Sequence, residues 1–444
     1  MAATPLTTDL YLLTMMAGYF EQGRHERTTA SFEAFVRKLP QQRNYLVAAG
    51  LASLVAYLEQ LRFSPDEIEW LRSHPVLSRL PAAFFEYLRQ FRFTGDVDAV
   101  PEGTPVFAQE PIVRVTAPIA QAQLIETAVL SFVNFQTSIA SKTSRIVTAA
   151  AGRPVMEFGA RRAHGLEAAL FAARSAYLAG ASSTSFVEAG REFGIPLSGT
   201  MAHSWVMSAV SESQAFADYM RVFGPESVLL LDTYDTLAAA RLVVESGLVP
   251  AGVRLDSGGL ATLSFQVREI LDRGGLSRTK ILVSGDLDEF SIAGLLADGA
   301  PIDGFGVGTR LVTSEDAPAL GGVYKLVEIV EGGSRRFVAK RSTGKPTWPG
   351  CKQVWREMRD GRAVRDIVSL ATEHRPEAVP LLHGIMRNGQ RVEGAISSLE
   401  ASRQWCATRL AELPVSTLNI GTTADYPVDI SAALSTEIES ATAP

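Results

Sequence analysis

The chain contains only two cysteines among its 444 residues, Cys351 and Cys406. Two cysteines are too few for the disulfide framework of a secreted scaffold, so the sequence predicts a reducing compartment. A strong excess of one charge is also missing, because the formal net charge is −6 and the pI is about 5.7. No run of basic residues with interleaved aromatics occurs, and we therefore expect no nucleic-acid partner.

Long uninterrupted apolar runs are missing as well. The most apolar region, residues 115–141, is interrupted by polar residues such as Gln121 and Glu126. It therefore falls short of the roughly 20 apolar residues that span a membrane. The first 20 residues have no basic residue before their apolar part and contain Asp9, which is not typical of a secretory signal. We expect no membrane association and a cytoplasmic location.

What the chain does contain is a recurrence in its middle third, where a short apolar run ends six times in a group of Gly, Ser, Asp, Arg or His. The six stretches are VMEFGARRAHG (155–165), PLSGTMAHSW (196–205), LLLDTYDT (229–236), GVRLDSGG (252–259), ILVSGDLDE (281–289) and GFGVGTR (304–310). A buried parallel strand is continuously apolar because helices cover both faces of its sheet. Ala- and Leu-rich segments follow the runs, so the recurrence predicts a βα repeat of barrel type.

The polar ends of these runs predict a shared site. In a barrel of parallel strands, the loops at the C-terminal strand ends converge on one pocket. The side chains expected there are Arg161, His203, Asp232, Arg254, Asp256, Asp286 and Arg310. Each stretch alone is compatible with an ordinary strand-to-helix turn, which favours Gly, Asp and Ser for backbone reasons. Six in succession fit the βα repeat better than six separate turns.

The segments before the repeat have other patterns. Residues 6–93 predict mainly helices, with a proline-marked helix start at residues 64–74. Residues 94–117 alternate and carry several prolines, which indicates short antiparallel or edge strands. A long helix is expected from Gln121 to about Ala151.

After Gly321 the pattern predicts hairpins, with turn dipeptides Asp-Gly at 360–361 and Asn-Gly at 388–389. A last helix is expected at residues 395–413, and the tail after Leu418 has few residues to bury. We expect the outer strands to join in one discontinuous domain around the barrel. The expected domains are a discontinuous α+β domain, residues 1–151 and 322–444, and an α/β barrel domain, residues 152–321.

The glycines of GFGVGTR suit an anion. Gly304, Gly306 and Gly308 allow backbone N–H groups to approach a phosphate closely, as late loops of α/β barrels often do. The alternative is a tight turn that needs positive φ. The position after the sixth run favours phosphate. No GxxxxGK[ST] sequence occurs, so no nucleotide is held by a P-loop.

Arg254 and Asp256 lie two residues apart, so their side chains point to one side of an extended segment. A carboxylate there suits the hydroxyls of a ribose, and a guanidinium suits a phosphate or carboxylate. The alternative is an ordinary surface ion pair.

His203 serves as base, metal ligand or nucleophile, or is a hydrogen-bonded structural side chain. Asp232 and Asp235 either orient an imidazole or hold magnesium, and we expect one of the two to cap a helix instead. The histidines are too scattered for a tightly bound transition metal.

Taken together, these motifs resemble the nicotinate phosphoribosyltransferases. The resemblance covers nearly the whole chain: TDLYLLTM (8–15), EFGARRAHG (157–165), GTMAHSW, LLDTYDT, VRLDSGG, VSGDLDE, GFGVGTRL and KRSTGKPTWPGCKQVWR (340–356). It implies an incomplete TIM-like α/β barrel beside a discontinuous α+β domain. It also implies a homodimer with active sites at the interface.

The resemblance implies a reaction of nicotinate, phosphoribosyl diphosphate and ATP in NAD biosynthesis. The products are nicotinate mononucleotide, diphosphate, ADP and phosphate, and the chemistry is that of a glycosyltransferase coupled to ATP as in a ligase. By the same resemblance His203 is the phosphorylated histidine, and Asp232 orients its ring. Mg²⁺ is implied as a companion of the diphosphate, with no metal held tightly by the protein.

The resemblance also assigns residues to the substrates. Phe158 and the partner subunit's Tyr11 stack on the pyridine ring, and Arg161 balances the nicotinate carboxylate or the phosphates. Arg254 and Asp256 hold the phosphoribosyl group. The residues implied around the ribose, the 5′-phosphate and the diphosphate are Gly285, Asp286, Gly306, Gly308, Lys340 and Lys345.

Two other functions are weighed against this reaction. The related nicotinamide enzymes carry an acidic residue where this chain has Ser185, whose hydroxyl donates to a carboxylate, so the acid is favoured over the amide. The chain departs from the family pattern at Phe186 and Gly259. A catalytically silent barrel used for binding is the other alternative. Such a barrel is expected to lose charged strand ends first, and here they are present.

Overall fold

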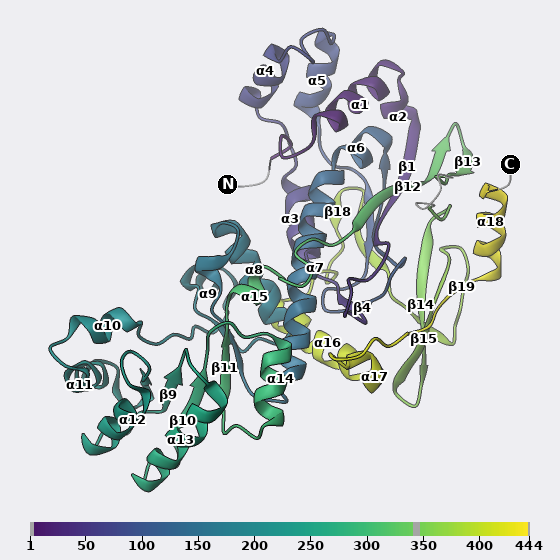
Figure 1. Cartoon of the computed structure of the whole chain (residues 1–444). Coiled ribbons are helices and arrows are strands. Elements are labelled where there is room, and N and C mark those ends of the chain that lie inside the picture. The colour runs from purple at the N-terminus through teal and green to yellow at the C-terminus, as the bar shows by residue number, and fades with distance from the viewer. Residues whose placement is uncertain (1–3, 341–346, 443–444) are drawn as a thin grey trace. The chain divides into compact units, whose positions relative to one another are not determined.

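The computed structural model describes residues 4–340 and 347–442. The chain forms two compact units (Figure 1). Unit 1 comprises Met1–Ser138 and Ala319–Pro444, and unit 2 comprises Ile139–Pro318. The first boundary between the units, after Ser138, falls inside the helix α7 (Glu126–Ala149). The sequence had predicted this boundary after residue 151.

Unit 2 contains a six-stranded parallel sheet with the order β7-β6-β11-β10-β9-β8. Its strands are β6 (Val155–Glu157), β7 (Ser183–Thr184), β8 (Val228–Leu230), β9 (Gly252–Leu255), β10 (Lys280–Val283) and β11 (Gly304–Val307). Side chains such as Val253, Val283 and Phe305 are fully buried, because helices cover the sheet. The predicted α/β class with an incomplete barrel is confirmed.

One of the six predicted strands is wrong. The run that begins at Pro196 makes only a single parallel bridge, between Leu197 and Thr184. The sixth strand is instead β7, which pairs with β6 through Ser183 and Thr184. Two polar residues have no apolar pattern, so the sequence did not reveal this strand.

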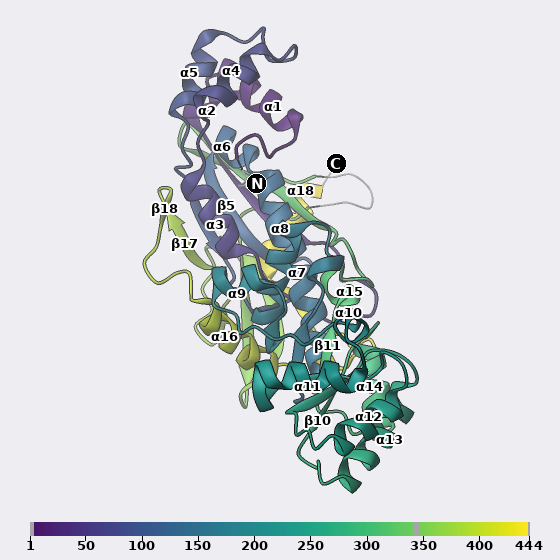
Figure 2. The ribbon, with the colours of Figure 1, turned by 90° about the vertical axis from the view of Figure 1, so that its left-hand side faces the viewer.

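The helices of unit 2 follow the strands. They are α8 (Leu166–Leu178), α9 (Val187–Phe193), α10 (His203–Ser208), α11 (Glu212–Phe223), α12 (Thr236–Glu245), α13 (Leu260–Arg273), α14 (Glu289–Ala297) and α15 (Thr309–Val312). Figures 1 and 2 show α12 and α13 side by side against the sheet. Asp235 caps α12 by accepting a hydrogen bond of 2.7 Å from the Ala238 N–H, so it is the capping member of the aspartate pair.

Unit 1 is built on a seven-stranded sheet with the order β13-β12-β1-β5-β3-β17-β18. Its strands are β1 (Thr28–Val36), β3 (Asp96–Ala99), β5 (Pro111–Pro118), β12 (Gly322–Glu331), β13 (Ser334–Phe337), β17 (His383–Arg387) and β18 (Gln390–Arg391). Strands β3 and β5, from residues 94–117, thus share one sheet with β12, β13, β17 and β18, from the segment after Gly321. The strand between them, β1, was not predicted, because its residues are buried on nearly every position and do not alternate.

Two smaller sheets complete unit 1. One pairs β2 (Leu46–Val47) with β4 (Pro105–Val106), and the other has the order β16-β14-β15-β19. The strands of the latter are β14 (Lys352–Arg359), β15 (Arg362–Leu370), β16 (Ala378–Pro380) and β19 (Val428–Ile430). Asp360 and Asn388 have φ values of 49° and 50° in the two predicted hairpin turns.

The helices of unit 1 pack against its sheets. They are α1 (Leu10–Glu21), α2 (Arg24–Arg27), α3 (Leu51–Gln60), α4 (Pro65–Ser73), α5 (Ala82–Gln90), α6 (Ile119–Leu124), α16 (Leu399–Ala411), α17 (Val415–Leu418) and α18 (Ala432–Thr442). The tail after Leu418 is thus more ordered than its composition suggests, since β19 pairs with β15 and Leu434 is fully buried. None of the helices in residues 4–340 and 347–442 is long and apolar enough to cross a membrane.

Candidate active site

A cavity of about 550 Å³ lies at the C-terminal ends of the strands of unit 2. Strands β6, β7, β9, β10 and β11 each supply residues to it, directly or through the loops that follow them. The predicted residues that line the cavity are Phe158, Arg161, Ser185, His203, Arg254, Asp256, Gly285, Asp286, Gly306 and Gly308. Residues from across the sheet meet here because parallel strands all end at the same edge.

The other predicted residues do not line this cavity. Asp232 lies next to it, where it braces a neighbouring loop. Tyr11, on α1, and Lys340 belong to unit 1. Lys345 lies outside the described residues.

His203 is the first residue of α10. Its Nδ1 lies 3.2 Å from the Thr233 hydroxyl, and its Nε2 lies 3.9 Å from the Asp256 carboxylate. The side chain is 39% exposed. The loops after β8 and β9 thus hold the imidazole while part of the ring remains accessible from the cavity.

Asp232 contacts the backbone of the next strand end and not the imidazole. Its Oδ2 accepts hydrogen bonds from the Asp256 N–H at 3.1 Å and from the Ser257 hydroxyl at 2.5 Å. Within the described chain no hydrogen bond joins Asp232 to His203, so the expected orientation of the ring by Asp232 is not made through a direct hydrogen bond. Asp232 instead holds the backbone of Asp256, whose carboxylate faces the imidazole.

Arg254 and Asp256 are not a surface ion pair, since no salt bridge joins them in the part of the chain that the structure describes. Arg254 donates from Nη1 to the Thr200 hydroxyl at 2.5 Å, while its Nε is buried without a partner. Burial lowers the pKa of Arg254, although Asp256 and Asp232 oppose this effect. Asp256 accepts a short hydrogen bond from the Ser284 hydroxyl. A partly desolvated guanidinium with an unused donor is suited to an anionic ligand.

Glu157, the last residue of β6, supports the opposite side of the cavity. Its carboxylate accepts a short hydrogen bond from the Gly159 N–H and a second, of 2.5 Å, from the Thr184 hydroxyl. Burial raises the pKa of Glu157, and the two hydrogen bonds oppose the shift. Glu157 therefore holds the segment that carries Phe158 and also Thr184, the residue before Ser185, in fixed positions.

Gly285 allows the loop after β10 to approach the loop after β9. Its φ is 115°, and a Cβ atom there would lie 2.7 Å from the Asp256 carbonyl oxygen. A larger residue would separate these loops, so both the positive φ and the close approach require glycine at this position. The alternative of a positive φ for Gly304, Gly306 and Gly308 does not apply, because none of these three has one.

The sequence did not single out four hydroxyl partners and the buried Glu157. Thr200, Thr233, Ser257 and Ser284 bond respectively to Arg254, His203, Asp232 and Asp256. Each lies in or directly beside a motif that was recognised for its charged or glycine residues. The only signal in the sequence for these five residues was their position within or beside the recognised motifs.

The described residues include no group of three or more His, Cys, Asp or Glu that could hold a metal ion. The fold and the cavity define an incomplete-barrel protein whose site combines three arginines, two carboxylates and glycine-rich strand ends, a set of groups suited to an anionic ligand.

Comparisons with known proteins identify the family. Residues 6–134 match the nicotinate phosphoribosyltransferase (NAPRTase) N-terminal domain. Nicotinate phosphoribosyltransferase pncB2 of Mycobacterium tuberculosis is 45% identical over 433 residues, which cover 96% of this chain and 91% of that protein. The Bacillus subtilis nicotinate phosphoribosyltransferase is 45% identical over 360 residues, which cover 79% of this chain and 72% of that protein. The crystal structure of human nicotinic acid phosphoribosyltransferase matches with a TM-score of 0.84 and 29% identity. The match covers 98% of this chain and 99% of the human chain. The chain belongs to the nicotinate phosphoribosyltransferase family.

Proposed function

We propose that the protein transfers the phosphoribosyl group of phosphoribosyl diphosphate to nicotinate, giving nicotinate mononucleotide and diphosphate, as a step of NAD biosynthesis in the cytoplasm. The observation that carries the proposal is the cavity, where Arg254 presents an unused buried donor beside Asp256 and three glycines of two strand ends. The relatives named nicotinate phosphoribosyltransferase, which align over most of their length, support the same reaction.

The phosphoribosyl group fits the side of the cavity formed by β9, β10 and β11. Arg254 suits a phosphate, and Asp256 suits the two ribose hydroxyls. Gly285, Gly306 and Gly308 line the cavity without side chains, which suits a close approach of an anion to the backbone of these strand ends. As the bond from the anomeric carbon to diphosphate breaks, positive charge develops on the sugar. The task of the protein is then to position the reactants and stabilise that charge, for which fixed carboxylates are suited.

The residues also fit a magnesium ion that arrives with the diphosphate. The Asp256 and Asp286 carboxylates line the cavity, and the Asp232 Oδ1 is buried without a partner. Oxygen ligands of this kind are the ones that magnesium prefers, usually together with substrate phosphates. When bound, the ion would neutralise charge on the leaving diphosphate.

Nicotinate fits the side formed by β6 and β7. The Phe158 ring offers a face for the pyridine, the exposed Ser185 hydroxyl can donate to the carboxylate, and Arg161 supplies positive charge. We propose that the partner subunit's Tyr11 completes the stack in a homodimer, and that Lys340 and Lys345 contribute near the diphosphate. Sedimentation with and without substrates tests the dimer.

ATP hydrolysis is proposed to act through His203. A ring nitrogen attacks the γ-phosphorus of ATP, the bond to the leaving oxygen breaks, and ADP departs. Water later cleaves the phosphohistidine to phosphate and restores the imidazole. The ring suits this role because the Thr233 hydroxyl holds its Nδ1 and it remains partly exposed. A phosphorylated ring would add negative charge beside Asp256 and so change the affinity for substrates between steps.

The test is to incubate the purified protein with phosphoribosyl diphosphate, magnesium and either nicotinate or nicotinamide, with and without ATP. Chromatography then quantifies the mononucleotide. Nicotinate mononucleotide formed faster with ATP supports the reaction, the acid preference and the coupling together. Turnover of nicotinamide instead would contradict the assignment of Ser185. Absence of product from either base would favour a silent barrel.

A further inference from the structure

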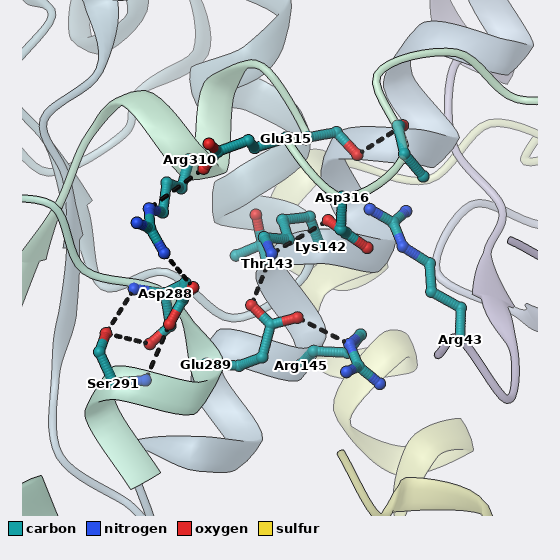
Figure 3. A network of polar contacts seen from close by, with 12 residues as sticks. Arg43, Lys142, Thr143, Arg145, Asp288, Glu289, Ser291, Arg310, Glu315 and Asp316 are labelled. Atoms are coloured by element: carbon teal, nitrogen blue, oxygen red, sulfur yellow. Dashed lines mark hydrogen bonds and ion pairs between the residues drawn. The ribbon is translucent and has the colours of Figure 1, made fainter. Parts of the chain in front are cut away.

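Arg310, the second residue of α15, links two of the loops that build the cavity (Figure 3). Its Nη1 lies 2.5 Å from Oδ2 of Asp288, and its Nε lies 3.1 Å from Oε2 of Glu315. The hydrogen bond to Asp288 is the main reason that the pKa of Arg310 is raised, and the charges of Glu315 and Asp286 add to this effect. The guanidinium is therefore held by two carboxylates, those of Asp288 and Glu315. The nearby charge of Asp286, which lines the cavity, also favours its charged form.

Asp288 is itself rigidly held. It caps α14, with a hydrogen bond of 2.8 Å from the Ser291 N–H to its Oδ1 and one of 2.8 Å from its own N–H to the Ser291 hydroxyl. Its other carboxylate oxygen is the one that meets Arg310. The capping box fixes the Asp288 side chain, so the position of Arg310 follows from the start of α14.

The residues next to this pair form a second, buried ion cluster that joins the same two segments to α7. Lys142 lies 2.6 Å from Glu289 and 3.0 Å from Asp316, and Arg145 lies 2.9 Å from Glu289. Glu289 is fully buried, and the two cations are 3% exposed. In each acidic dipeptide, 288–289 and 315–316, one carboxylate binds Arg310 and the other binds Lys142 (Figure 3).

The positions of Asp288 and Arg310 along the chain relate this pair to the residues that line the cavity. Asp288 follows Asp286 by two residues, and Arg310 follows Gly308 by two residues. Asp286 and Gly308 line the cavity, whereas neither Asp288 nor Arg310 is among its lining residues. A change in this pair would therefore alter the separation of the two loops without removing a group that faces the cavity.

We propose that Asp288 and Arg310 are a positioning pair, which holds the loop after β10 and the loop after β11 at the separation that receives the phosphoribosyl group of phosphoribosyl diphosphate. The inference rests on the proposed function. When the pair is broken, the two loops populate the binding geometry only part of the time, and the apparent affinity falls by that fraction. Once the substrate is bound, the loops are ordered again, so the turnover of the bound complex changes little.

A direct role for Arg310 as a phosphate ligand is the competing explanation, and the two give different mutant patterns. If Arg310 binds phosphate itself, Asp288→Asn leaves the cation in place and binding stays close to wild type. If the two residues act as a pair, Asp288→Asn and Arg310→Gln have the same effect. Asparagine also retains the capping oxygen for the Ser291 N–H, so the start of α14 is preserved.

The experiment compares Asp288→Asn, Arg310→Gln and the double variant with wild type. Arg273→Gln is the matched control, because Arg273 pairs with Glu269 on the exposed face of α13, outside the cavity lining. We expect each single variant to raise KM for phosphoribosyl diphosphate about tenfold while kcat changes less than about threefold. The double variant should match the singles, because one coupled interaction is lost in all three. Arg310→Lys, which keeps a charge, should recover part of the affinity.

Calorimetric titration of phosphoribosyl diphosphate without nicotinate separates the outcomes. Wild-type protein that neither binds this ligand nor makes product overturns the proposed function. Active wild-type protein with variants indistinguishable from Arg273→Gln overturns the positioning role alone. Loss of binding in Arg310→Gln with normal binding in Asp288→Asn would also overturn it, in favour of direct phosphate contact. If the variants have a lower melting temperature and a lower kcat but the wild-type KM, the pair is purely structural and the positioning role is wrong.

Discussion

A Cβ atom at Gly306 would lie 2.6 Å from Cδ2 of Phe158. Gly306 lies on β11, opposite Met156 of the paired strand β6. Phe158 directly follows β6, and its N–H donates to the Val307 carbonyl at 2.8 Å. The ring of Phe158 thus occupies space that any other residue at 306 would fill. Glycine at this position therefore leaves room for the aromatic ring, apart from the role toward an anion that we propose for it.

Gly306→Ala is expected to displace the Phe158 ring and weaken the binding of nicotinate. The new methyl group requires the ring or the strand to move, and such overpacking typically costs about 1–3 kcal/mol. We expect KM for nicotinate to rise about tenfold, with steady-state kinetics as the measurement. Gly259→Ala is the control, since a Cβ there meets no atom within 4 Å. An unchanged KM for nicotinate in Gly306→Ala would show that the ring does not contact the base.

His203→Ala is expected to abolish ATP hydrolysis and the stimulation of the transfer by ATP, while a weaker transfer remains. The reason is that the variant loses the phosphoryl acceptor but keeps the residues of the phosphoribosyl side. The measurements are ADP release and mononucleotide formation with and without ATP. Thr233→Val removes only the hydroxyl next to Nδ1, and we expect it to retain coupling with a reduction of up to about tenfold. Full ATP coupling in His203→Ala would refute the phosphohistidine assignment.

Ser185→Asp is expected to shift the preference from nicotinate toward nicotinamide. A carboxylate in place of the hydroxyl repels the nicotinate carboxylate and accepts from an amide N–H. We expect kcat/KM for nicotinate to fall by roughly 100-fold, since close like charges cost a few kcal/mol. Competition between the two bases in one reaction measures the shift. Ser185→Asn has the same size without the charge, so an equal loss in both variants would assign the effect to size alone.

Glu157→Gln is expected to stabilise the protein relative to wild type as the pH rises. Because burial raises the pKa of Glu157 above 4.5, the stability that its protonated form contributes is fully present below 4.5. It is lost as the pH rises through the raised pKa of the folded state, at about 1.4 kcal/mol for each unit of the shift. Glutamine keeps an acceptor for the Gly159 N–H without the charge. Urea unfolding of both proteins between about pH 4 and about pH 8 measures the difference. A difference that shrinks with rising pH would contradict the predicted sign.

Local pattern was sufficient for the strands of unit 2 that follow from an apolar run, such as β8 (VLL) and the ILV segment of β10, and for the hairpin turns at Asp360 and Asn388. Local pattern failed for strands that have no apolar run or that are buried on both faces. Strand β7 is short and polar, and β1 is buried on both faces, so neither shows the alternation that marks a half-buried strand.

The sequence by itself determined most of the side chains that line the cavity, because the C-terminal ends of parallel strands meet at one edge and each motif follows such an end. Asp232 and Arg310 were also expected there, and neither lines the cavity. Only the tertiary structure decided the partners within that set. Asp232 bonds to the loop of Asp256 and not to His203, and Arg310 meets Asp288 from a different loop. Hydrogen bonds and ion pairs depend on differences of about an ångström between side chains from separate loops, and the spacing of residues along a chain does not set distances of that size.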